Sequence, residues 1–408
     1  MQFKAEQVGA PTGVARATLL VPLLILLLVT FGLIALFSAG YSMSLREPTA
    51  AVARQLAYVP LALLLGWLAW RVDLERLREL RWAIFGLVIF LLVLARTPGI
   101  GRMVNGSWRW IDFGLFRLQP SDLAKVALVI LIADHIARWQ RRSLPIREPF
   151  LAFSGRQPYL FTRGRWEDLR DGFLRPMLPL LGICAGIALG PDLGTIVLCC
   201  FVAFAMLFVG GARLSYLGAT LALGSVAFTY LVLNWGSRLR RFLSFLDPEG
   251  RQGDESYQLF QGMLAFAVGG VTGAGPGNGL QQRAYLPEAH TDFVFTIIGE
   301  EWGLVATVGV AGIYLLVFHL VMRELRACTD LFRLSLALGG VLFLTLQALV
   351  NMCVVTGLLP TKGISLPFVS YGGTNLVTSA VLIGLMLNAL RDGGRPALRP
   401  AIVPASAP

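Results

Sequence analysis

The sequence predicts an all-α, polytopic integral membrane protein with about ten transmembrane helices and a large extracytoplasmic loop between helices 7 and 8. Three observations predict this class. The 408 residues are 56% hydrophobic and only 14% charged, with a mean hydropathy of +0.68, whereas soluble domains carry about 25% charged residues. Apolar runs long enough to cross a bilayer recur along the chain. Basic residues are concentrated in alternate connections between these runs.

The apolar runs account for most of the chain, and each is roughly 20 residues long or somewhat shorter. They cover residues 17–39, 52–70, 82–96, 121–138, 176–190, 193–211, 214–234, 303–322, 332–356 and 372–390. The first run is long enough to span a bilayer and lacks a clear small-residue cleavage site. We therefore expect no removable signal peptide.

The basic residues predict the orientation of these spans. Arginines are concentrated in residues 71–81, 138–175 and 323–333 and in the tail after Arg391. All four segments fall on the cytoplasmic side if the N-terminus is cytoplasmic, so both termini are expected inside. The connection 235–298 then faces outward, and its own arginines do not overturn the topology because long loops escape this rule.

The expected organisation has three parts. Residues 1–16 form a cytoplasmic N-terminus, and residues 17–390 form a single transmembrane domain whose outer loop, 235–298, carries the candidate catalytic segment. Residues 391–408, rich in Pro and Ala, form a cytoplasmic tail that we expect to be disordered. The net charge of +11 would suggest nucleic acid in a soluble protein, but the basic residues here flank membrane spans, and no nucleic-acid partner is expected.

The most informative segment is Tyr285–Glu301, which concentrates charge at the edge of a predicted span. Its acids are Glu288, Asp292, Glu300 and Glu301. A carboxylate at membrane depth is costly and usually has a function. Phe293 and Phe295 would partly desolvate Asp292, which raises the pKa of its carboxyl toward the range useful to a general base. In a helix Asp292 shares one face with Glu288; the alternative is an acid that caps the following helix.

A second group of charges opens the fourth apolar run. Asp122 and Lys125 are three residues apart and lie on one face of a helix, so they could pair within the membrane. Asp122 could instead act only as a cap. Lys125 lies one turn into an apolar helix, and unless it snorkels it should face a polar cavity.

Further charged residues lie in the connections predicted to face the extracytoplasmic side of the membrane. Asp192 stands between the fifth and sixth runs, where it could cap the sixth span or join Asp122 in a cation site or ion-pair network. Trp108 and Trp110 are expected to be interfacial anchors, and Arg109 between them could bind phosphate or a carbohydrate acid. Lys362 is the lone cation of a Pro/Gly-punctuated loop on the same membrane side as Asp292.

The outer loop also contains a basic run, RLRRF, that begins at Arg238. Arg238, Arg240 and Arg241 could contact lipid headgroups at the membrane boundary. Alternatively, one of them could neutralise a substrate diphosphate, for which a guanidinium group is well suited. The sequence contains no Walker loop, HExxH motif, nucleophile elbow, zinc spacing or dinucleotide fingerprint, so ATP-driven transport and metalloprotease activity have no support.

At these residues the chain resembles the SEDS family of bacterial peptidoglycan polymerases, which comprises FtsW, RodA and the sporulation relatives such as SpoVE. The resemblance covers the chain from about residue 20 to 390. It is carried, in family order, by WRWIDFG, QPSDLAK, PDLGT, FLDPEG with YQL, YLPEAHTDF, IGEEWG and LPTKGISLPFVSYGGT. The PTKG motif resembles the division branch of the family, FtsW, more than the elongation branch, RodA.

The chain departs from the family pattern at several positions. Asp122 stands where the family usually has Glu, which keeps the charge but shortens its reach by one methylene. Gly190 replaces the usual Gln before PDLGT. The usual Gln-Lys pair before YLPE reads Gln281-Gln282, with Arg283 one place later, which puts in doubt any phosphate contact assigned to that lysine.

The resemblance implies an inverting glycosyltransferase that polymerises lipid II, an undecaprenyl-diphosphate-linked substrate, into glycan strands during septal wall synthesis. It implies that Asp292 is the general base. The residues implied to bind substrate are Arg109, Asp122, Lys125, Asp192, Arg238, Arg241, Glu288 and Lys362. No metal ligand set is evident, although a divalent cation is compatible with this chemistry. The alternatives are a lipid II flippase and a non-catalytic scaffold for division proteins.

The resemblance also implies a location and partners. The protein would be a multi-pass protein of the bacterial cytoplasmic (inner) membrane, with its active site facing the periplasm or exterior. Its partners would be a class B penicillin-binding protein transpeptidase and other divisome proteins.

Overall fold

The computed structural model describes most of the predicted transmembrane domain. The described residues are 12–42, 50–104, 107–114, 116–143, 166, 168–234, 245, 254–280, 290–326 and 328–392. The predicted site residues Arg238, Arg241 and Glu288 lie outside them. So do most of the predicted cytoplasmic N-terminus and nearly all of the predicted tail.

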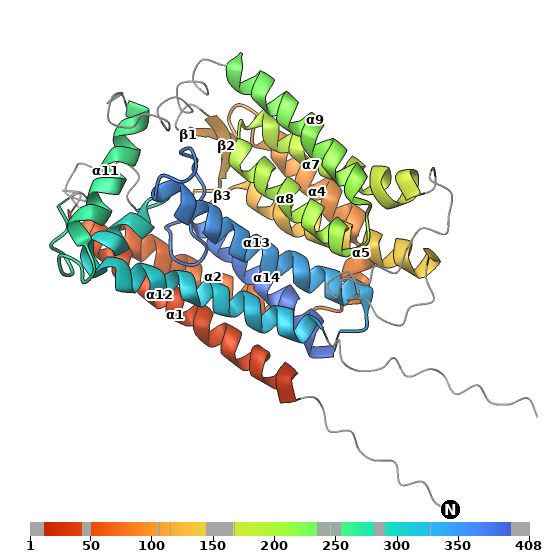
Figure 1. Cartoon of the computed structure of the whole chain (residues 1–408), viewed down its shortest axis with the longest axis horizontal. Coiled ribbons are helices and arrows are strands. Elements are labelled where there is room, and N and C mark those ends of the chain that lie inside the picture. The colour runs from red at the N-terminus through yellow and green to blue at the C-terminus, as the bar shows by residue number, and fades with distance from the viewer. Residues whose placement is uncertain are drawn as a thin grey trace, which may run out of the picture.

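Long helices dominate the described residues and run side by side along the long axis of the molecule (Figure 1). They are α1 (Thr12–Ser42), α2 (Ala50–Arg71), α3 (Leu74–Glu79), α4 (Arg81–Leu94), α5 (Pro120–Ser143), α7 (Arg175–Leu189), α8 (Leu193–Val209), α9 (Leu214–Leu233), α11 (Asp254–Gly269), α12 (Val294–Leu325), α13 (Leu331–Val355) and α14 (Gly373–Asp392). A short π-helical segment, η2 (Asp168–Leu174), leads into α7. All of these except α3, α11 and η2 overlap one of the ten predicted apolar runs.

The described residues include six helical segments that are long and apolar enough to cross a membrane. These lie in α1, α2, η2 with α7, α12, α13 and α14. The apolar parts of α4, α8 and α9 are shorter. The helix α5 carries five ionisable residues within its apolar run, Asp122, Lys125, Asp134, His135 and Arg138. The class of the fold is therefore that of a polytopic, all-α membrane protein, while the count of ten spans stays a prediction.

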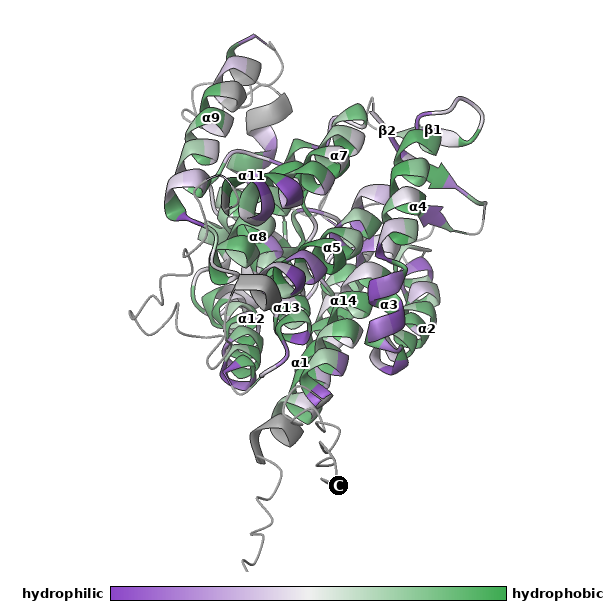
Figure 2. Cartoon of the chain, turned by 90° about the vertical axis from the view of Figure 1, so that its right-hand side faces the viewer, coloured by the Kyte–Doolittle hydropathy of each residue, from purple (hydrophilic) through white to green (hydrophobic). Residues whose placement is uncertain are grey.

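The helices differ in how deeply they are buried. In the most apolar 18-residue stretch of α14, 83% of the residues are buried inside the protein, whereas in the corresponding stretch of α2 only 11% are buried. The helix α13 packs against α5, α8, α12 and α14, and α14 packs against α2 as well. The outward faces of α1, α2, α4, α9 and α12 expose large aliphatic and aromatic side chains, as expected for helices that meet lipid tails. Figure 2 shows these helices coloured mostly as hydrophobic, whereas the short helix α3 is hydrophilic.

A small antiparallel sheet covers one end of the bundle. It consists of β1 (Gly101–Val104), β2 (Ser107–Asp112) and β3 (Arg117–Leu118) in that order. Ile111 pairs with both Gly101 and Leu118 and is 1% exposed. The sequence predicted interfacial anchors at Trp108 and Trp110 in this region, but no strands. The helices α5 and α14 both begin close to this sheet, so it marks the end of the bundle at which their N-termini lie.

The helix α12 is broken near its start, at Gly303. The φ of this residue is 73°, a left-handed conformation that glycine adopts without steric cost. The segment 270–280, which follows α11, fits against the break. Ala274 N–H donates to Glu300 O (2.9 Å), and Leu304 N–H donates to Gly270 O (2.9 Å). These bonds satisfy backbone groups that the break would otherwise leave unpaired.

Candidate active site

Asp292 lies in a tight turn, residues 290–293, directly before α12. The residue is half-buried, and the next side chain, Phe293, is 2% exposed. Phe293 occupies the N-cap position of α12, and its side chain forms no capping hydrogen bond. Asp292 therefore stands one residue outside the position at which an aspartate would cap this helix.

The turn is fastened to the rest of the protein by backbone contacts. Asn351, on α13, donates from Nδ2 to Asp292 O (2.8 Å) and to Ile364 O (2.7 Å). Tyr371 N–H donates to His290 O (3.0 Å). These bonds join the turn to the loop 356–372, which connects α13 to α14, although the turn and the loop are far apart in the sequence.

The loop 356–372 brings a cation to the same place. A Cβ added at Gly363 would lie 3.0 Å from Asp292 Oδ2, so the loop backbone passes directly beside the carboxylate. Lys362 is the preceding residue and is partly buried. Burial lowers the pKa of the Lys362 ammonium, and the Asp192 carboxylate partly offsets this effect. The loop residue that lies beside the Asp292 carboxylate is Gly363, and the charge that acts on Lys362 is that of Asp192, so a direct action of Lys362 on Asp292 stays a prediction.

Asp192 lies at the start of α8 and is 6% exposed. Its Oδ1 accepts from Thr195 N–H (3.2 Å), and its Oδ2 accepts from the Thr195 hydroxyl (2.8 Å) and the Ser121 hydroxyl (3.3 Å). The capping role considered for this residue is therefore present, and the carboxylate also acts on Lys362. The packing of Ile364 against Gly194 brings the same loop and helix together.

Arg109, on β2, holds the turn that precedes Asp192. Its Nε donates to Gly190 O (2.5 Å) and its Nη2 donates to Pro191 O (2.8 Å). A small cavity of about 20 Å³ lies between Arg109, Ser121 and Asp192. Arg109 and Asp192 therefore belong to one side-chain cluster, although they are far apart in the sequence.

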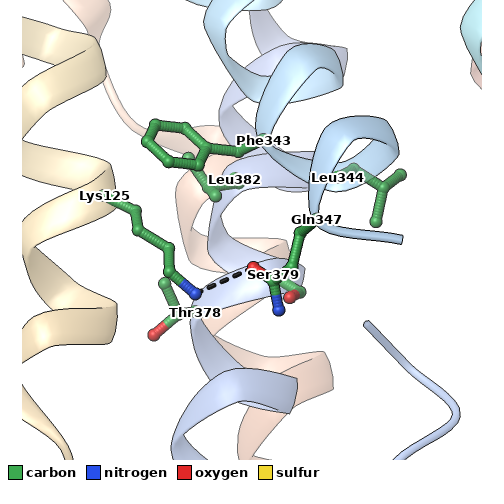
Figure 3. Close-up of a pocket in the computed structure, with 7 residues that line it drawn as sticks. All are labelled: Lys125, Phe343, Leu344, Gln347, Thr378, Ser379 and Leu382. Carbon is green, nitrogen blue, oxygen red and sulfur yellow. Dashed lines mark hydrogen bonds between the residues drawn. The ribbon is translucent and has the colours of Figure 1, made fainter. Parts of the chain in front are cut away.

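Asp122 and Lys125 form the ion pair that their spacing predicts. Lys125 Nζ lies 2.7 Å from Asp122 Oδ1, and the residues are 4% and 5% exposed, respectively. Lys125 Nζ also donates to Gln347 Oε1 on α13 (2.8 Å), as Figure 3 shows. A cavity of about 10 Å³ adjoins this contact, and its other lining residues are Phe343, Leu344, Thr378, Ser379 and Leu382. Lys125 does not snorkel, because its ammonium is buried between Asp122 and Gln347, but the cavity beside it is mostly apolar rather than polar.

Gln347 connects this ion pair to the loop 356–372. Its Nε2 donates to Ser365 O (2.8 Å) and to Asn375 Oδ1 (3.0 Å). Gln347 and Asn351 lie four residues apart on α13 and hold successive carbonyl groups of the loop, those of Ser365 and Ile364. Two sets of hydrogen bonds, joined by the backbone between Ile364 and Ser365, therefore connect Lys125 to the backbone of Asp292.

Glu300 and Glu301 are fully buried beside the break in α12, at 0% and 1% exposure. Glu300 Oε1 accepts from Leu280 N–H (2.6 Å), and Glu301 Oε1 accepts from Gly277 N–H (2.9 Å) and from the Ser38 hydroxyl. Both acids hold the segment 270–280 against α12.

The structure brings Arg109, Asp122, Lys125, Asp192, Asp292 and Lys362 to one end of the bundle. The sequence analysis missed Gln347, Asn351 and Gly363. The two amides stand one helical turn apart inside an apolar run, and buried polar residues of this kind in a span are a signal of function. Within the described residues, no three His, Cys, Asp or Glu side chains are grouped to hold a metal ion, so a divalent cation stays a prediction.

The fold and this cluster define a polytopic membrane protein with a charged site at one end of its helical bundle. Residues 18–393 match the FtsW/RodA/SpoVE family, described as cell cycle proteins. The chain belongs to this family.

Proteins from two bacteria illustrate the relationship, and both are named probable peptidoglycan glycosyltransferase FtsW. The Coxiella burnetii protein is 36% identical over 367 residues, which cover 88% of this chain and 92% of that protein. The Trichlorobacter lovleyi protein is 36% identical over 392 residues, which cover 94% and 95% of the two chains.

Solved structures show the same fold. The rod shape determining protein RodA of Thermus thermophilus is 26% identical, with a TM-score of 0.64 over 92% of this chain and 97% of that one. A chain from a structure concerned with the coordination of polymerization and crosslinking by a peptidoglycan synthase complex is 27% identical. Its TM-score is 0.72, over 92% of this chain and 98% of that chain.

Proposed function

We propose that this protein is an inverting peptidoglycan glycosyltransferase that polymerises lipid II during septal wall synthesis, with Asp292 as the general base. Support for the activity comes from the FtsW relatives, which are more than a third identical over most of the chain. Support for the base comes from one geometric observation. The Asp292 carboxylate lies against Gly363, and the residue before Gly363 in the loop is the partly buried cation Lys362.

The proposed reaction needs a base and a positive charge in the same place. The Asp292 carboxylate accepts the proton of the acceptor 4-hydroxyl while that oxygen forms a bond to the anomeric carbon of the donor sugar. The bond from this carbon to the undecaprenyl diphosphate breaks, and the diphosphate leaves with the bonding electrons. Lys362, together with Arg238 and Arg241 in the outer loop, would stabilise the leaving charge.

The other predicted residues would act around this pair. Asp192 would keep Lys362 charged, since its carboxylate favours the ammonium form. Arg109 would hold the turn that carries Asp192. Asp122 and Lys125 would anchor the loop 356–372 through Gln347, and Glu288 would orient the substrate.

The proposed orientation puts this end of the bundle on the periplasmic side of the cytoplasmic membrane, with both termini inside. Lipid II would then reach the site after it has been flipped. The class B penicillin-binding protein proposed as a partner would crosslink the strand; the similarity to a chain from a peptidoglycan synthase complex supports such a partner.

The test uses the purified full-length protein in lipid vesicles with labelled lipid II, with and without the transpeptidase partner. We expect glycan chains from the wild type and a loss of about 10²–10⁴-fold in polymerisation rate for Asp292→Asn, at unchanged thermal stability. Asp112→Asn is the matched control, because Asp112 is an acid of the sheet at the same end of the bundle and pairs with Arg102. Glycan synthesis by Asp292→Asn at the wild-type rate would exclude Asp292 as the base, and transbilayer movement of lipid II without chains would favour a flippase.

A further inference from the structure

Two neutral amide side chains stand in the middle of the polar network of the candidate active site. Gln347 and Asn351 lie one helical turn apart on α13 and are 3% and 1% exposed. A carboxamide buried in a membrane span is costly unless its hydrogen-bonding groups find partners. Asn351 donates to two backbone carbonyl groups, those of Asp292 and Ile364, whereas Gln347 donates to the backbone carbonyl of Ser365 and to Asn375 Oδ1.

Asn351 binds the backbone of two different segments at once. An amide nitrogen carries two hydrogens, and Asn351 Nδ2 donates to two carbonyls, Asp292 O at 2.8 Å and Ile364 O at 2.7 Å. The Asn351 Oδ1 atom is buried and accepts no hydrogen bond from the described residues. The two donor bonds therefore fix the side chain, and the side chain in turn fixes the distance between the two segments.

The two segments that Asn351 joins are the turn 290–293 and the loop 356–372, and the proposed chemistry depends on the distance between them. Asp292, in the turn, is the proposed base. Ile364, in the loop, follows Lys362 and Gly363, and Gly363 lies beside the Asp292 carboxylate. Tyr371 N–H binds the start of the turn 290–293 at His290 O. The Asn351 amide binds the turn at Asp292 itself, from the helix α13.

We propose that Asn351 is a positioning residue, which holds the base-bearing turn and the cation-bearing loop in register by donating to one carbonyl of each. This inference rests on the proposed function, because it assigns Asn351 an effect that acts through Asp292. Loss of the amide should let the two segments drift by a fraction of an ångström to an ångström. Misplacement of this size can cost on the order of 10²-fold in rate without loss of substrate binding.

The chain contains a matched control for this proposal. Asn388, on α14, is 2% exposed and also donates from Nδ2 to two backbone carbonyls, Ala69 O (3.1 Å) and Val72 O (2.7 Å). It lies toward the opposite end of the bundle, where α2 ends. Asn351→Ala and Asn388→Ala therefore remove the same chemical group and the same number of buried hydrogen bonds, but only one of them is near Asp292.

The experiment measures kcat and KM for lipid II, together with the thermal unfolding midpoint, for both alanine variants in lipid vesicles. We expect comparable falls in unfolding temperature. We expect kcat to fall on the order of 10²-fold for Asn351→Ala only, with an unchanged KM. Asn351→Gln, which returns an amide donor one methylene further out, should recover part of that kcat.

Three results would overturn the proposal: a wild-type kcat for Asn351→Ala, an equal loss of kcat in both alanine variants, or a raised KM at unchanged kcat. If Asn351→Ala does not fold, Asn351→Gln decides. A lowered kcat at unchanged KM supports the proposal, and a wild-type kcat rejects it. Failure of the wild type to polymerise lipid II would instead count against the proposed function.

Discussion

The two ends of the helical bundle hold buried carboxylates in different ways. At the end opposite the candidate active site, Asp134 is 3% exposed and is surrounded by three guanidinium groups. The Nε atoms of Arg78, Arg81 and Arg138 lie 2.5, 2.8 and 2.9 Å from its oxygens. At the active-site end, Asp292 is only half-buried, and its turn is held through a main-chain carbonyl by the neutral amide of Asn351.

This difference separates a structural use of charge from a chemical one. The oxygens of the Asp134 carboxylate are occupied by ion pairs with three guanidinium groups. The cluster around Asp134 joins α3, α4 and α5, so its charges serve to lock helices together. The turn that carries Asp292, the proposed base, is instead held through its backbone, by the bond from Asn351 to Asp292 O.

The largest expected effect is a loss of free energy of unfolding when the ion pairs of Asp134 are removed, and it tests whether this cluster is structural. Asp134→Asn leaves three guanidinium groups without their shared counter-ion, two of them at 12% and 14% side-chain exposure. Breaking a buried ion pair in this way should lower the free energy of unfolding by about 3 kcal/mol. The measurement is unfolding in mixed micelles, with polymerisation by the folded fraction measured in parallel, and we expect that activity to be retained.

The control for this change is Asp73→Asn at the same end of the bundle. Asp73 caps α3 and pairs with Arg76 in an exposed contact, with side-chain exposures of 55% and 81%. Asn is as good a cap as Asp, and exposed ion pairs contribute less than about 1 kcal/mol, so little change is expected. If Asp134→Asn abolished polymerisation at unchanged stability, the cluster around Asp134 would have a functional role and the contrast would fail.

A smaller effect is expected from the close approach at Gly363. The φ of this residue lies outside the left-handed region, so alanine fits its backbone, but the new Cβ would lie 3.0 Å from Asp292 Oδ2. The carboxylate must then shift by a few tenths of an ångström, which should lower the polymerisation rate about tenfold. Gly309→Ala on α12 is the control, because its Cβ would meet nothing within 4 Å. Equal rates for both variants would show that the space beside Asp292 is not used in catalysis.

Much of the fold could be predicted from the sequence because bilayer thickness imposes a length on apolar runs. Each predicted run coincides with a helix, and even the run 303–322 lies within α12, which begins earlier, at Val294. The sheet was missed because its strands are short and their pairing depends on contacts that no local pattern shows. Nor does a local pattern show the break at Gly303, since the segment that satisfies it comes from residues 270–280.

The candidate site was predictable only where charge and spacing gave a local signal. Asp122 and Lys125 are three residues apart on one helix, and their ion pair is present in the structure. By contrast, Asn351 carries no charge, and its two partners lie on different segments, so periodicity could not identify its contacts. The approach of Gly363 to Asp292 joins residues far apart in the chain, and only the folded structure brings them together.

The smallest expected effect concerns the pH dependence of the cation beside the proposed base. Burial lowers the pKa of Lys362 from the ordinary value of 10.5, so the ammonium loses its proton at a lower pH than a solvated lysine would. If this charge stabilises the diphosphate, polymerisation should fall on the alkaline side as Lys362 deprotonates. Lys362→Arg keeps its charge at all accessible pH values, so its alkaline limb should move to higher pH. Polymerisation rates measured from about pH 7 to pH 10 test this, and coincident alkaline limbs for the two proteins would assign the charge at the leaving group to another residue.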